Sequence, residues 1–449
     1  MNWLKTLLPR KNKRSAHIEP RRVPRSEHPI SRSQFTQGTL RTLYGLKDAG
    51  YEAYVVGGGV RDILAGQRPK DFDIATNAHP EEVRRIFRSC RLVGRRFLIC
   101  HVRWGQEVVE VTTFRGAITD EHERDETGRI LADNLYGTLE TDAFRRDFTV
   151  NALYYDIRDH SIIDFAGGLD DMQRRAIRLI GDPELRYRED PVRMLRAVRI
   201  ANKLGFTIEQ HSAAPIPKLA GLLREIPPAR LFDEVIKLLQ SRDAAANFEG
   251  LERYGLLEQL MPVAHAALRD ERYAGFIRQG LSNTAERLAN EQSVSPAFLY
   301  AVLLWPGVAQ EFRRLVEAEG QHANVAIAQA AEATLARAQQ RIMIPKRFSL
   351  PMREIWVLQP RFDAPKGGRA KRLLTHPRFR AAYDFLMLRA GIGEVPQALA
   401  DWWTRAQLAP ELPPPPDAAA EPAAPAKRKR RRRRSGRRRE GAPANPPSQ

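Results

Sequence analysis

Apolar and polar residues alternate with different periods along the first part of the chain, and these periods predict its secondary structure. Leucines at helical spacing predict a helix over 39–52, which Gly50 ends. The apolar run over 53–56 leads into three glycines and predicts a strand followed by the start of a helix. The alternating segment 70–76 predicts another strand. Two longer runs, RFLICHVRW and QEVVEVTTF, predict an antiparallel strand pair joined near Gly105.

The second part of the chain changes to a helical pattern. Residues 119–135 are strongly charged and weakly patterned, so we expect a mobile loop there. TVNALYYDI and SIIDFAGG predict two more strands, and helical spacing then continues to about residue 409. The sequence therefore predicts an α+β fold, in which a head with a small mixed sheet precedes an all-α neck and body with disordered basic termini.

Composition excludes several classes of protein. The 449 residues are 43% hydrophobic with a mean hydropathy of −0.47, and no apolar run approaches the roughly 18 residues of a membrane-spanning helix. The first ten residues have no long apolar stretch and no small-residue cleavage site, so we do not expect secretion. Cys90 and Cys100 are too few for a disulfide scaffold. We expect ordinary buried thiols and a cytoplasmic protein.

Most of the formal net charge of +19 lies at the two ends. Residues 1–32 carry nine Lys and Arg against two Glu, and residues 410–449 carry eleven against four acids, behind a Pro/Ala linker. Such a tail does not bury enough apolar surface to fold. We expect it to bind RNA phosphates without sequence readout, although a solubilising or anionic-lipid-binding tail is the alternative. The expected RNA-binding residues are Lys427, Arg428, Lys429, Arg430, Arg431, Arg432, Arg433 and Arg434.

Three acids in the predicted head suggest a metal site. Asp71 and Asp73 are two apart on a predicted strand, so their side chains leave the same face. Hard oxygen ligands of this kind suit Mg²⁺, with Mn²⁺ as a second choice. Glu110 is an isolated acid in an apolar run, where a third metal ligand would explain it. Alone, the D-x-D pattern is common on protein surfaces.

A glycine-rich turn precedes these acids. Gly57 and Gly58 lie between the predicted strand and helix, where a triphosphate can approach the backbone closely. Arg61 is one turn into the helix and can reach phosphates, whereas Asp62 is expected to hold the local loop. The alternative is a tight turn that needs glycine for backbone reasons. The pattern is neither a P-loop nor a dinucleotide fingerprint.

Four motifs together resemble those of the class II nucleotidyltransferases, which comprise bacterial poly(A) polymerases and tRNA CCA-adding enzymes. They are GGGVRD at 57–62, DFD at 71–73, RRDFTVNA at 145–152 and EDPVR at 189–193. Further stretches resemble the bacterial poly(A) polymerases of that family: LVGRRFLICHV, REDPVRMLRAVR, IPPARLF and HPRFRAAYDFLMLRA. The resemblance covers most of residues 35–409.

The resemblance implies roles for particular residues. It implies that Asp147 joins Asp71 and Asp73 as a catalytic acid, that Arg145 and Arg146 contact the sugar and phosphates, and that Asn151 assists. From the sequence alone, the Arg-Arg-Asp triplet is equally compatible with a structural ion pair. Whether Glu110 or Asp147 completes the metal site stays open.

The helix predicted over 188–199 is expected to recognise the nucleotide. Asp190 and Arg193 are three apart on one face and offer an acceptor and a donor to an adenine base. The resemblance implies that Arg196 and Arg199, on the same stripe, meet the triphosphate. A solvated charged face is the alternative, but the intervening apolar residues indicate that the other side is buried.

The implied activity is template-independent polyadenylation, in which the 3′-hydroxyl of an RNA attacks the α-phosphate of ATP and pyrophosphate leaves. We expect a role in RNA processing and decay, with RNA 3′ ends, ATP and RNA-decay proteins as partners. The alternatives are a CCA-adding enzyme and a non-catalytic RNA-binding protein. The absence of a His-Asp dipeptide argues against the phosphohydrolase domain of some CCA-adding enzymes.

These features predict five segments. They are a basic arm at 1–34, a catalytic nucleotidyltransferase head at 35–180, a nucleotide-reading neck at 181–240, an RNA-binding body at 241–409 and a disordered tail at 410–449. Trp356, Trp402 and Trp403 in the body are expected to pack in the core rather than to stack on bases.

Overall fold

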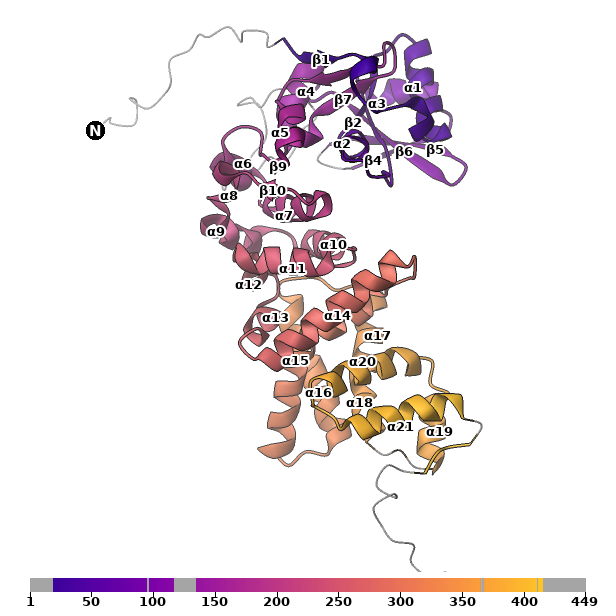
Figure 1. Cartoon of the computed structure of the whole chain (residues 1–449), viewed down its shortest axis with the longest axis vertical. Helices are drawn as coiled ribbons and strands as arrows, with labels where there is room; N and C mark the ends of the chain where they lie inside the picture. The colour runs from indigo at the N-terminus through magenta and orange to yellow at the C-terminus, as the bar shows by residue number, and fades with distance from the viewer. Residues whose placement is uncertain are drawn as a thin grey trace, which may run out of the picture.

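A head, a neck and a body follow one another along the longest axis of the molecule (Figure 1). The structure is a computed structural model that describes residues 19–94, 97–116, 135–363, 365, 367–409 and 411–414. The predicted α+β class is confirmed, with all eight strands of the main sheet in the head and helices beyond it. The loop expected at 119–135, apart from Leu135, and the basic run 427–434 lie outside the described residues.

The head is built on an eight-stranded mixed sheet with the order β1-β8-β7-β2-β3-β6-β5-β4. Only β3 and β6 are parallel neighbours, and the other pairs are antiparallel. The strands are β1 (Arg21–Val23), β2 (Ala53–Val56), β3 (Asp73–Thr76), β4 (Cys90–Val93), β5 (Ile99–Trp104), β6 (Glu107–Thr113), β7 (Leu153–Asp156) and β8 (Ile162–Asp164).

Alternation along the strands gives this sheet two apolar faces. Val55 and Ile74 belong to the core that α1 (Gln37–Asp48), α2 (Gly58–Leu64) and α3 (Pro80–Ile86) cover. Tyr54 and Ala75 point the other way, into a smaller core beside α4 (Leu139–Arg145). Because helices cover only part of the second face, polar side chains on it remain available for chemistry.

Residues 19–34, the described part of the N-terminal arm, belong to the head, so they do not form the separate arm that the boundary predicted at residue 34 implies. β1 forms an antiparallel pair with β8, and Val23 and Ile30 are buried in the sheet core. Two short 3₁₀ helices, η1 (Arg25–Glu27) and η2 (Arg32–Gln34), connect β1 to α1. The many arginines here concealed the strand, because arginine stems lie along a sheet edge while their charges stay in water.

The chain after the sheet is helical, apart from the short parallel pair β9 (Ala176–Ile177) and β10 (Thr207–Ile208). The helices leading into and through the neck are η3 (Thr149–Asn151), α5 (Gly168–Arg174), α6 (Pro183–Glu189), α7 (Val192–Leu204), α8 (Gln210–Ala213), α9 (Ile216–Leu219), η4 (Ala220–Glu225) and α10 (Pro228–Leu239). No helix of the described ranges has the length and apolarity that crossing a membrane requires.

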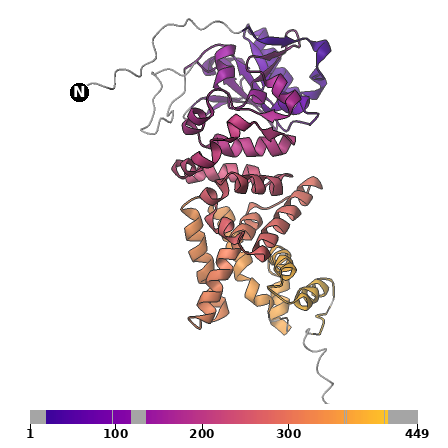
Figure 2. The same ribbon diagram turned by 60° about the vertical axis from the view of Figure 1, so that its left-hand side comes forward.

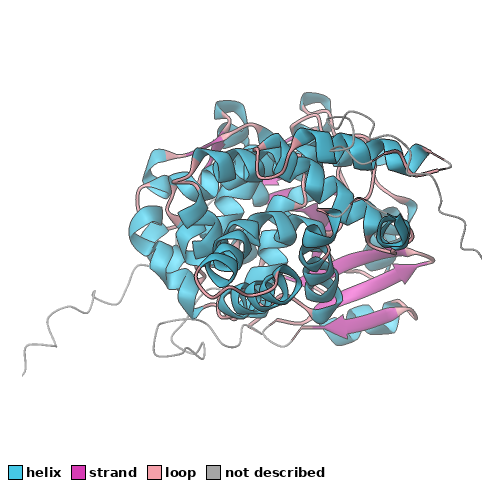
Figure 3. Cartoon of the chain, turned by 90° about the horizontal axis from the view of Figure 1, so that it is seen from below, coloured by secondary structure: helices cyan, strands magenta, loops and turns pink. Residues whose placement is uncertain are grey.

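The body helices are α11 (Ala244–Arg253), α12 (Leu256–Leu260), α13 (Pro262–Ala267), α14 (Glu271–Ala289), α15 (Pro296–Glu317), α16 (Ala323–Gln339), α17 (Lys346–Val357), α18 (Gln359–Phe362), α19 (Gly367–Leu374), α20 (Phe379–Gly391) and α21 (Gln397–Leu408). Figure 2 shows α7, α10 and α11 stacked between the head and the longer body helices. Figure 3, seen from below, shows the body helices in front of the head strands.

One apolar core runs through the neck and the body without a break at residue 240. It extends from Phe148 at the base of the head to Leu388 in α20. A separate core joins the last helices, and Trp402 and Trp403 are fully buried there, as Trp356 is in the main core. The prediction of core tryptophans is therefore confirmed. Leu412 packs on the last core, and the Trp402 indole N–H donates to the carbonyl oxygen of Pro414 over 2.8 Å, so the first tail residues contact the body.

We predict that Ile30→Ala destabilises the head, because this side chain is fully buried against the sheet. Removal of a buried isoleucine side chain costs about 2–5 kcal/mol. Urea unfolding monitored by circular dichroism measures the change. Arg22→Ala is the matched control, because its side chain is 50% exposed and should leave the midpoint unchanged. Equal midpoints for Ile30→Ala and the native chain would contradict the assignment of residues 19–34 to the head.

Candidate functional site

The glycine turn lies where the sequence predicted it, directly after β2. Gly57 has a φ of 75° and ψ of −130°, a conformation that favours glycine because a side chain would be strained there. A Cβ at this position would face Asp73 Oδ2 at 3.9 Å and Arg146 Nη1 at 3.7 Å. The turn therefore lies beside Asp73 and Arg146. Gly58 begins α2.

Arg61 lies inside the head rather than at a phosphate-binding surface. Its guanidinium donates to Asp62 Oδ1 over 2.6 Å and to Asn151 Oδ1 over 2.5 Å, and the side chain is only 7% exposed. Asp62 also accepts from Lys203 Nζ, which connects α2 to α7. The expectation that Asp62 holds the local loop fits these contacts. The expectation that Arg61 reaches phosphates does not, because its hydrogen-bonding groups are committed within the protein.

The three predicted acids come from neighbouring segments. Asp73 is the first residue of β3 and pairs in register with Glu110 on β6, so both leave the same face of the sheet. Asp71 lies before the strand and is exposed, contrary to the expectation that both aspartates lie on it. Phe72, between them, is buried against Gly59.

Burial and repulsion from neighbouring acids raise the pKa of Asp73. Partial burial contributes most, followed by the negative charges of Glu110 and Asp71, and together they raise the pKa to about 6. Such a carboxylate is stabilised by a nearby cation. No group of three or more His, Cys, Asp or Glu side chains within the described ranges is gathered closely enough to hold a metal ion by itself. The donor chemistry fits a hard divalent cation, whereas the compact three-acid cage expected from the sequence is not assembled.

Glu110 is not the buried acid that the sequence indicated. Its side chain is 49% exposed, because Val109 and Val111 take the buried face of β6. His101 Nε2 on the neighbouring β5 lies 3.5 Å from Glu110 Oε1. The alternation of β6 explains its solvent exposure without a metal.

Asp142 holds the Arg146 side chain in place, and the sequence analysis did not identify this role. Its carboxylate accepts hydrogen bonds from Arg146, Arg115 and Tyr154 over 2.8, 3.1 and 2.7 Å. Burial alone would raise the pKa of Asp142, but the two positive charges and the hydrogen bonds hold it well below its usual range. The sequence signal was the i,i+4 spacing of Asp142 and Arg146.

Asp147 connects the head to the neck. One carboxylate oxygen accepts from Arg196 Nη2 over 2.6 Å, and the other accepts from Asn151 Nδ2 over 2.9 Å and from the Phe148 amide over 2.8 Å. Burial opposes ionisation, but these partners hold the pKa of Asp147 well below its usual range. Both oxygens are therefore engaged by the protein itself, and Arg196 is placed beside Asp73, whose pKa it lowers.

The helix predicted over 188–199 is broken near its start, at residues 190–191. α6 ends at Glu189, and Asp190 is extended with φ −150° and ψ 90° because Pro191 follows it. α7 begins at Val192, so Asp190 and Arg193 do not share one helical face. The prediction that Asp190 and Arg193 lie on one face of a single helix is therefore wrong.

Neighbouring side chains place the predicted nucleotide-reading pair. Arg230 on α10 donates to Asp190 Oδ2 over 2.8 Å, and Arg193 donates to Glu189 over 3.0 Å. Arg186 donates to the main-chain carbonyls of Arg145 and Arg146, over 3.1 and 2.6 Å, and fixes that turn. Burial and the nearby arginines lower the pKa of Arg186 to about 10. The sequence did not assign a function to Arg186, Glu189 or Arg230.

Arg193, Arg196 and Arg199 form the predicted stripe along α7, whose other side is buried. The Nε atom of Arg199 is buried and has no hydrogen-bond partner among the described residues. Burial and the positive charge of Arg196 lower the pKa of Arg199. A buried guanidinium beside another one is a favourable position for an anionic ligand.

Comparison with known proteins assigns the family. Three family models match the chain: "Poly A polymerase head domain" at residues 53–178, "Probable RNA and SrmB- binding site of polymerase A" at 205–268, and "Polymerase A arginine-rich C-terminus" at 319–439. The chain is 46% identical to the poly(A) polymerase I of Salmonella typhi over 396 residues, which are 86% of this chain and 85% of that protein. The chain belongs to the poly(A) polymerase family.

Membership of the poly(A) polymerase family confirms the class II nucleotidyltransferase resemblance. A CCA-adding enzyme of Bacillus velezensis is 35% identical over 250 residues, which cover 56% of this chain and 62% of that enzyme. Among solved structures, the Bacillus stearothermophilus CCA-adding enzyme in complex with CTP is 28% identical, with a TM-score of 0.53 over 82% of this chain and 81% of that one. Both matches place the CCA-adding enzymes as relatives within the wider class.

We predict that Asp142→Asn destabilises the chain by about 3–5 kcal/mol at neutral pH, because it leaves Arg146 buried without its charge partner. The folded pKa of Asp142 lies below its unfolded value of about 3.9, so its contribution is present above that value and is lost as the pH falls below it. Urea unfolding at several pH values measures both effects.

In that series, the difference between the native chain and Asp142→Asn should shrink below about pH 4. Glu184→Gln is the control, because Glu184 is 58% exposed and its ion pair with Arg188 contributes little. A difference that stays constant from neutral to acidic pH would contradict the assigned role of the Asp142 charge.

Proposed function

We infer that this chain polyadenylates RNA, transferring AMP from ATP to a 3′-hydroxyl without a template. The new bond joins the 3′-oxygen to the α-phosphorus, the bond between the α-phosphorus and the bridging oxygen breaks, and pyrophosphate leaves. The observation that carries the inference is the 46% identity to a poly(A) polymerase I over 86% of the chain. It covers the head with its acids as well as the helical parts.

We propose that Asp73, with Asp71 and Glu110 beside it, supplies oxygen ligands to Mg²⁺, or Mn²⁺, and that substrate phosphate supplies the rest, because the three acids form no closed cage among the described residues. Bound there, such a cation would lower the pKa of the attacking hydroxyl and stabilise the leaving phosphate charge. Support comes from the hard oxygen donors and from the repulsion among them. Asp147 is proposed as a positioning residue, because Arg196 and Asn151 occupy its oxygens.

Arginines are proposed to bind the triphosphate opposite these acids. Arg146 and Arg196 both lie close enough to lower the pKa of Asp73, so they are near the place where phosphate charge would arrive. Arg199 has a buried donor to offer. Gly57 and Gly58 carry no side chain that would stand between these arginines and a phosphate, and Gly58 is half-buried. Arg145, whose carbonyl Arg186 holds, is proposed to contact the sugar side.

Adenine selection is proposed for Asp190 and Arg193. Adenine carries a donor at N6 and an acceptor at N1, so recognition of this edge needs one acceptor and one donor. Asp190 supplies the acceptor and Arg193 the donor, although they come from two elements rather than one helix. Their ion pairs with Arg230 and Glu189 restrict both side chains, which favours one nucleotide over another.

We propose the predicted segments as functional units, with residues 19–34 added to the head. The neck at 181–240 reads the nucleotide, the body at 241–409 holds RNA, and Lys427–Arg434 in the tail add phosphate contacts. Two free cysteines favour a cytoplasmic location. RNA-decay proteins are proposed partners, and the description of the family model over 205–268 names one protein, SrmB.

CCA addition is the second candidate, favoured by the shared fold and by relatives 35% identical over about half the chain. The poly(A) polymerase match extends over much more of the chain, and the arginine-rich C-terminal model reaches residue 439. A non-catalytic RNA-binding protein would not need the acids of the head. Polyadenylation therefore has the stronger support.

We predict that the purified chain, given Mg²⁺, a generic RNA and one nucleotide at a time, extends the RNA many times with ATP and scarcely with CTP. Denaturing gels of the labelled RNA measure the length of each product. A tRNA ending in CC serves as the second acceptor. Addition of one A to that tRNA, with no extension of generic RNA, would identify a CCA-adding enzyme instead.

We predict that Asp73→Asn lowers AMP transfer by roughly a hundredfold or more, since metal-assisted charge stabilisation contributes several kcal/mol. Affinity for RNA should be retained, because the substitution removes a ligand of the metal and no group that binds RNA. Single-turnover transfer and fluorescence anisotropy measure the two properties. Asp170→Asn is the matched control in the head, where Asp170 is 55% exposed and paired with Arg21. Parallel loss of RNA binding in Asp73→Asn would count against a metal-binding role.

A further inference from the structure

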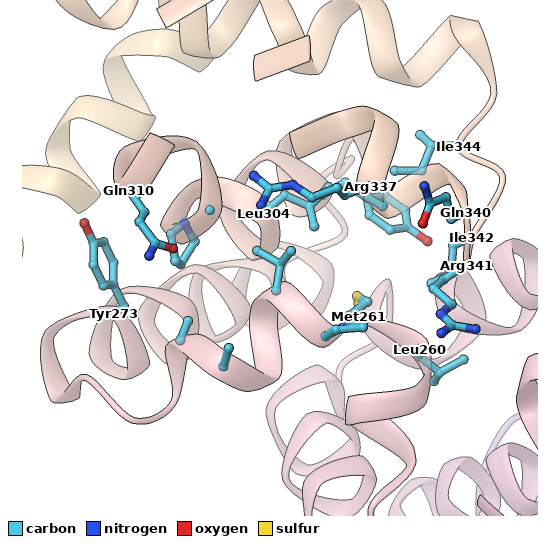
Figure 4. Close-up of a pocket in the computed structure, with 18 of the residues that line it drawn as sticks. Leu260, Met261, Tyr273, Leu304, Gln310, Arg337, Gln340, Arg341, Ile342 and Ile344 are labelled. Atoms are coloured by element: carbon cyan, nitrogen blue, oxygen red, sulfur yellow. The ribbon is translucent and has the colours of Figure 1, made fainter. Parts of the chain in front are cut away.

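A large cavity lies in the body (Figure 4). The helices that line it lie on the far side of the neck from the head (Figure 1). Its volume is about 690 Å³. The α12–α13 corner, the start of α14, the middle of α15 and the end of α16 enclose it, together with the segment that leads to α17. This volume exceeds what one nucleoside fills, and nothing in the proposed reaction uses it.

The cavity combines an apolar middle with polar ends. Leu260, Met261, Leu304, Ile342 and Ile344 line it. Figure 4 shows Tyr273 and Gln310 at one end and Gln340 and Arg341 at the other, with Arg337 between them. Amide groups and apolar walls together are what an unstacked nucleobase needs, because its flat faces are apolar and its edges carry donors and acceptors.

The charge of the cavity is strongly positive. Arg313, Arg337 and Arg341 line it, against Asp270 as the one acid among its described lining residues. Asp270 accepts hydrogen bonds from Arg272, so its charge is already engaged. Arg337 and Arg313 make only 3.4 Å contacts to neutral groups, and none of the three forms an ion pair within the described residues. These guanidinium groups are available for phosphate oxygens.

Tyr300 supplies a second, independent observation. It lines the cavity and is only 1% exposed, yet its hydroxyl has no hydrogen-bond partner among the described residues. Its ring stacks on Phe232 of α10, with centroids 5.7 Å apart and planes at 13°, so the side chain is held in place. A buried hydroxyl without a partner is costly, and a ligand with a polar edge would satisfy it.

We propose that this cavity binds an unpaired stretch of the RNA substrate upstream of its 3′ end. A base lies against the apolar wall and hydrogen-bonds to Tyr300, while Arg337 and Arg341 contact the flanking phosphates. The cavity is separated from the head by the neck, so the bound nucleotides are ones already in the strand. The inference rests on the proposed function, because it takes RNA as the substrate.

Tyr300→Phe tests the hydroxyl separately from folding. Removal of an unpartnered buried hydroxyl should leave the thermal unfolding midpoint equal or higher. The same change should weaken binding of a long oligoadenylate by about two- to tenfold, the worth of one hydrogen bond. Fluorescence anisotropy on the full chain measures the affinity, and differential scanning fluorimetry measures the midpoint.

The double variant Arg337→Ala/Arg341→Ala tests the phosphate contacts. It should lower the slope of log affinity against log salt by about 1.4, since each phosphate contact to single-stranded nucleic acid contributes about 0.7. Arg278→Ala/Arg353→Ala is the matched control, because these exposed arginines of the same body lie outside the cavity.

The outcomes separate this inference from the proposed function. If Tyr300→Phe and the arginine variant both bind long RNA as the native chain does, or if the decreases in affinity equal that of the control, the cavity is not an RNA site. Failure of the native chain to transfer AMP at all would reject the proposed function instead, and that is measured without any cavity variant.

Discussion

The bond between Asp147 and Arg196 joins the two halves of the proposed active site. Asp147 follows α4 in the head, whereas Arg196 is in the middle of α7 in the neck. The glycine turn and the acids belong to the head, and the arginine stripe belongs to the neck. The Asp147 side chain is buried and that of Arg196 is about one third exposed, so the pair lies at the boundary between the head and the neck. The pair therefore fixes how far the arginines stand from the acids.

Charge balance around this bond gives the site its chemistry. Burial and neighbouring acids raise the pKa of Asp73, whereas burial and neighbouring arginines lower the pKa values of Arg186 and Arg199. The acids therefore lie together on one side of the site and the arginines on the other, with few opposite charges between them. A metal ion would relieve the repulsion on one side and a triphosphate on the other. The metal ion and the triphosphate are therefore expected to bind together, because each relieves the repulsion on one side of the site.

The neck and the body share one core, so the positions of the neck side chains depend on the packing of the body. Phe232 on α10 packs against Tyr300 on α15, and α10 also carries Arg230, which holds Asp190. The same helix therefore touches both the proposed base-reading pair and the wall of the body cavity. A close-packed interior leaves little freedom for these groups to move separately.

The amino-acid sequence determined the elements and the motifs, because period and residue type are local properties. The strands around Gly57, the glycines that end helices and strands, and the acid pair at Asp71 and Asp73 were all readable along the chain. The tertiary structure decided which charged side chains bond to other residues of the protein and are not available to a ligand. Arg61 and Asp147 have the residue types of ligand-binding groups, but partners distant in sequence, Asn151 for one and Arg196 for the other, occupy them. Pairing between distant residues depends on how the sheet and helices pack, and no local period records it.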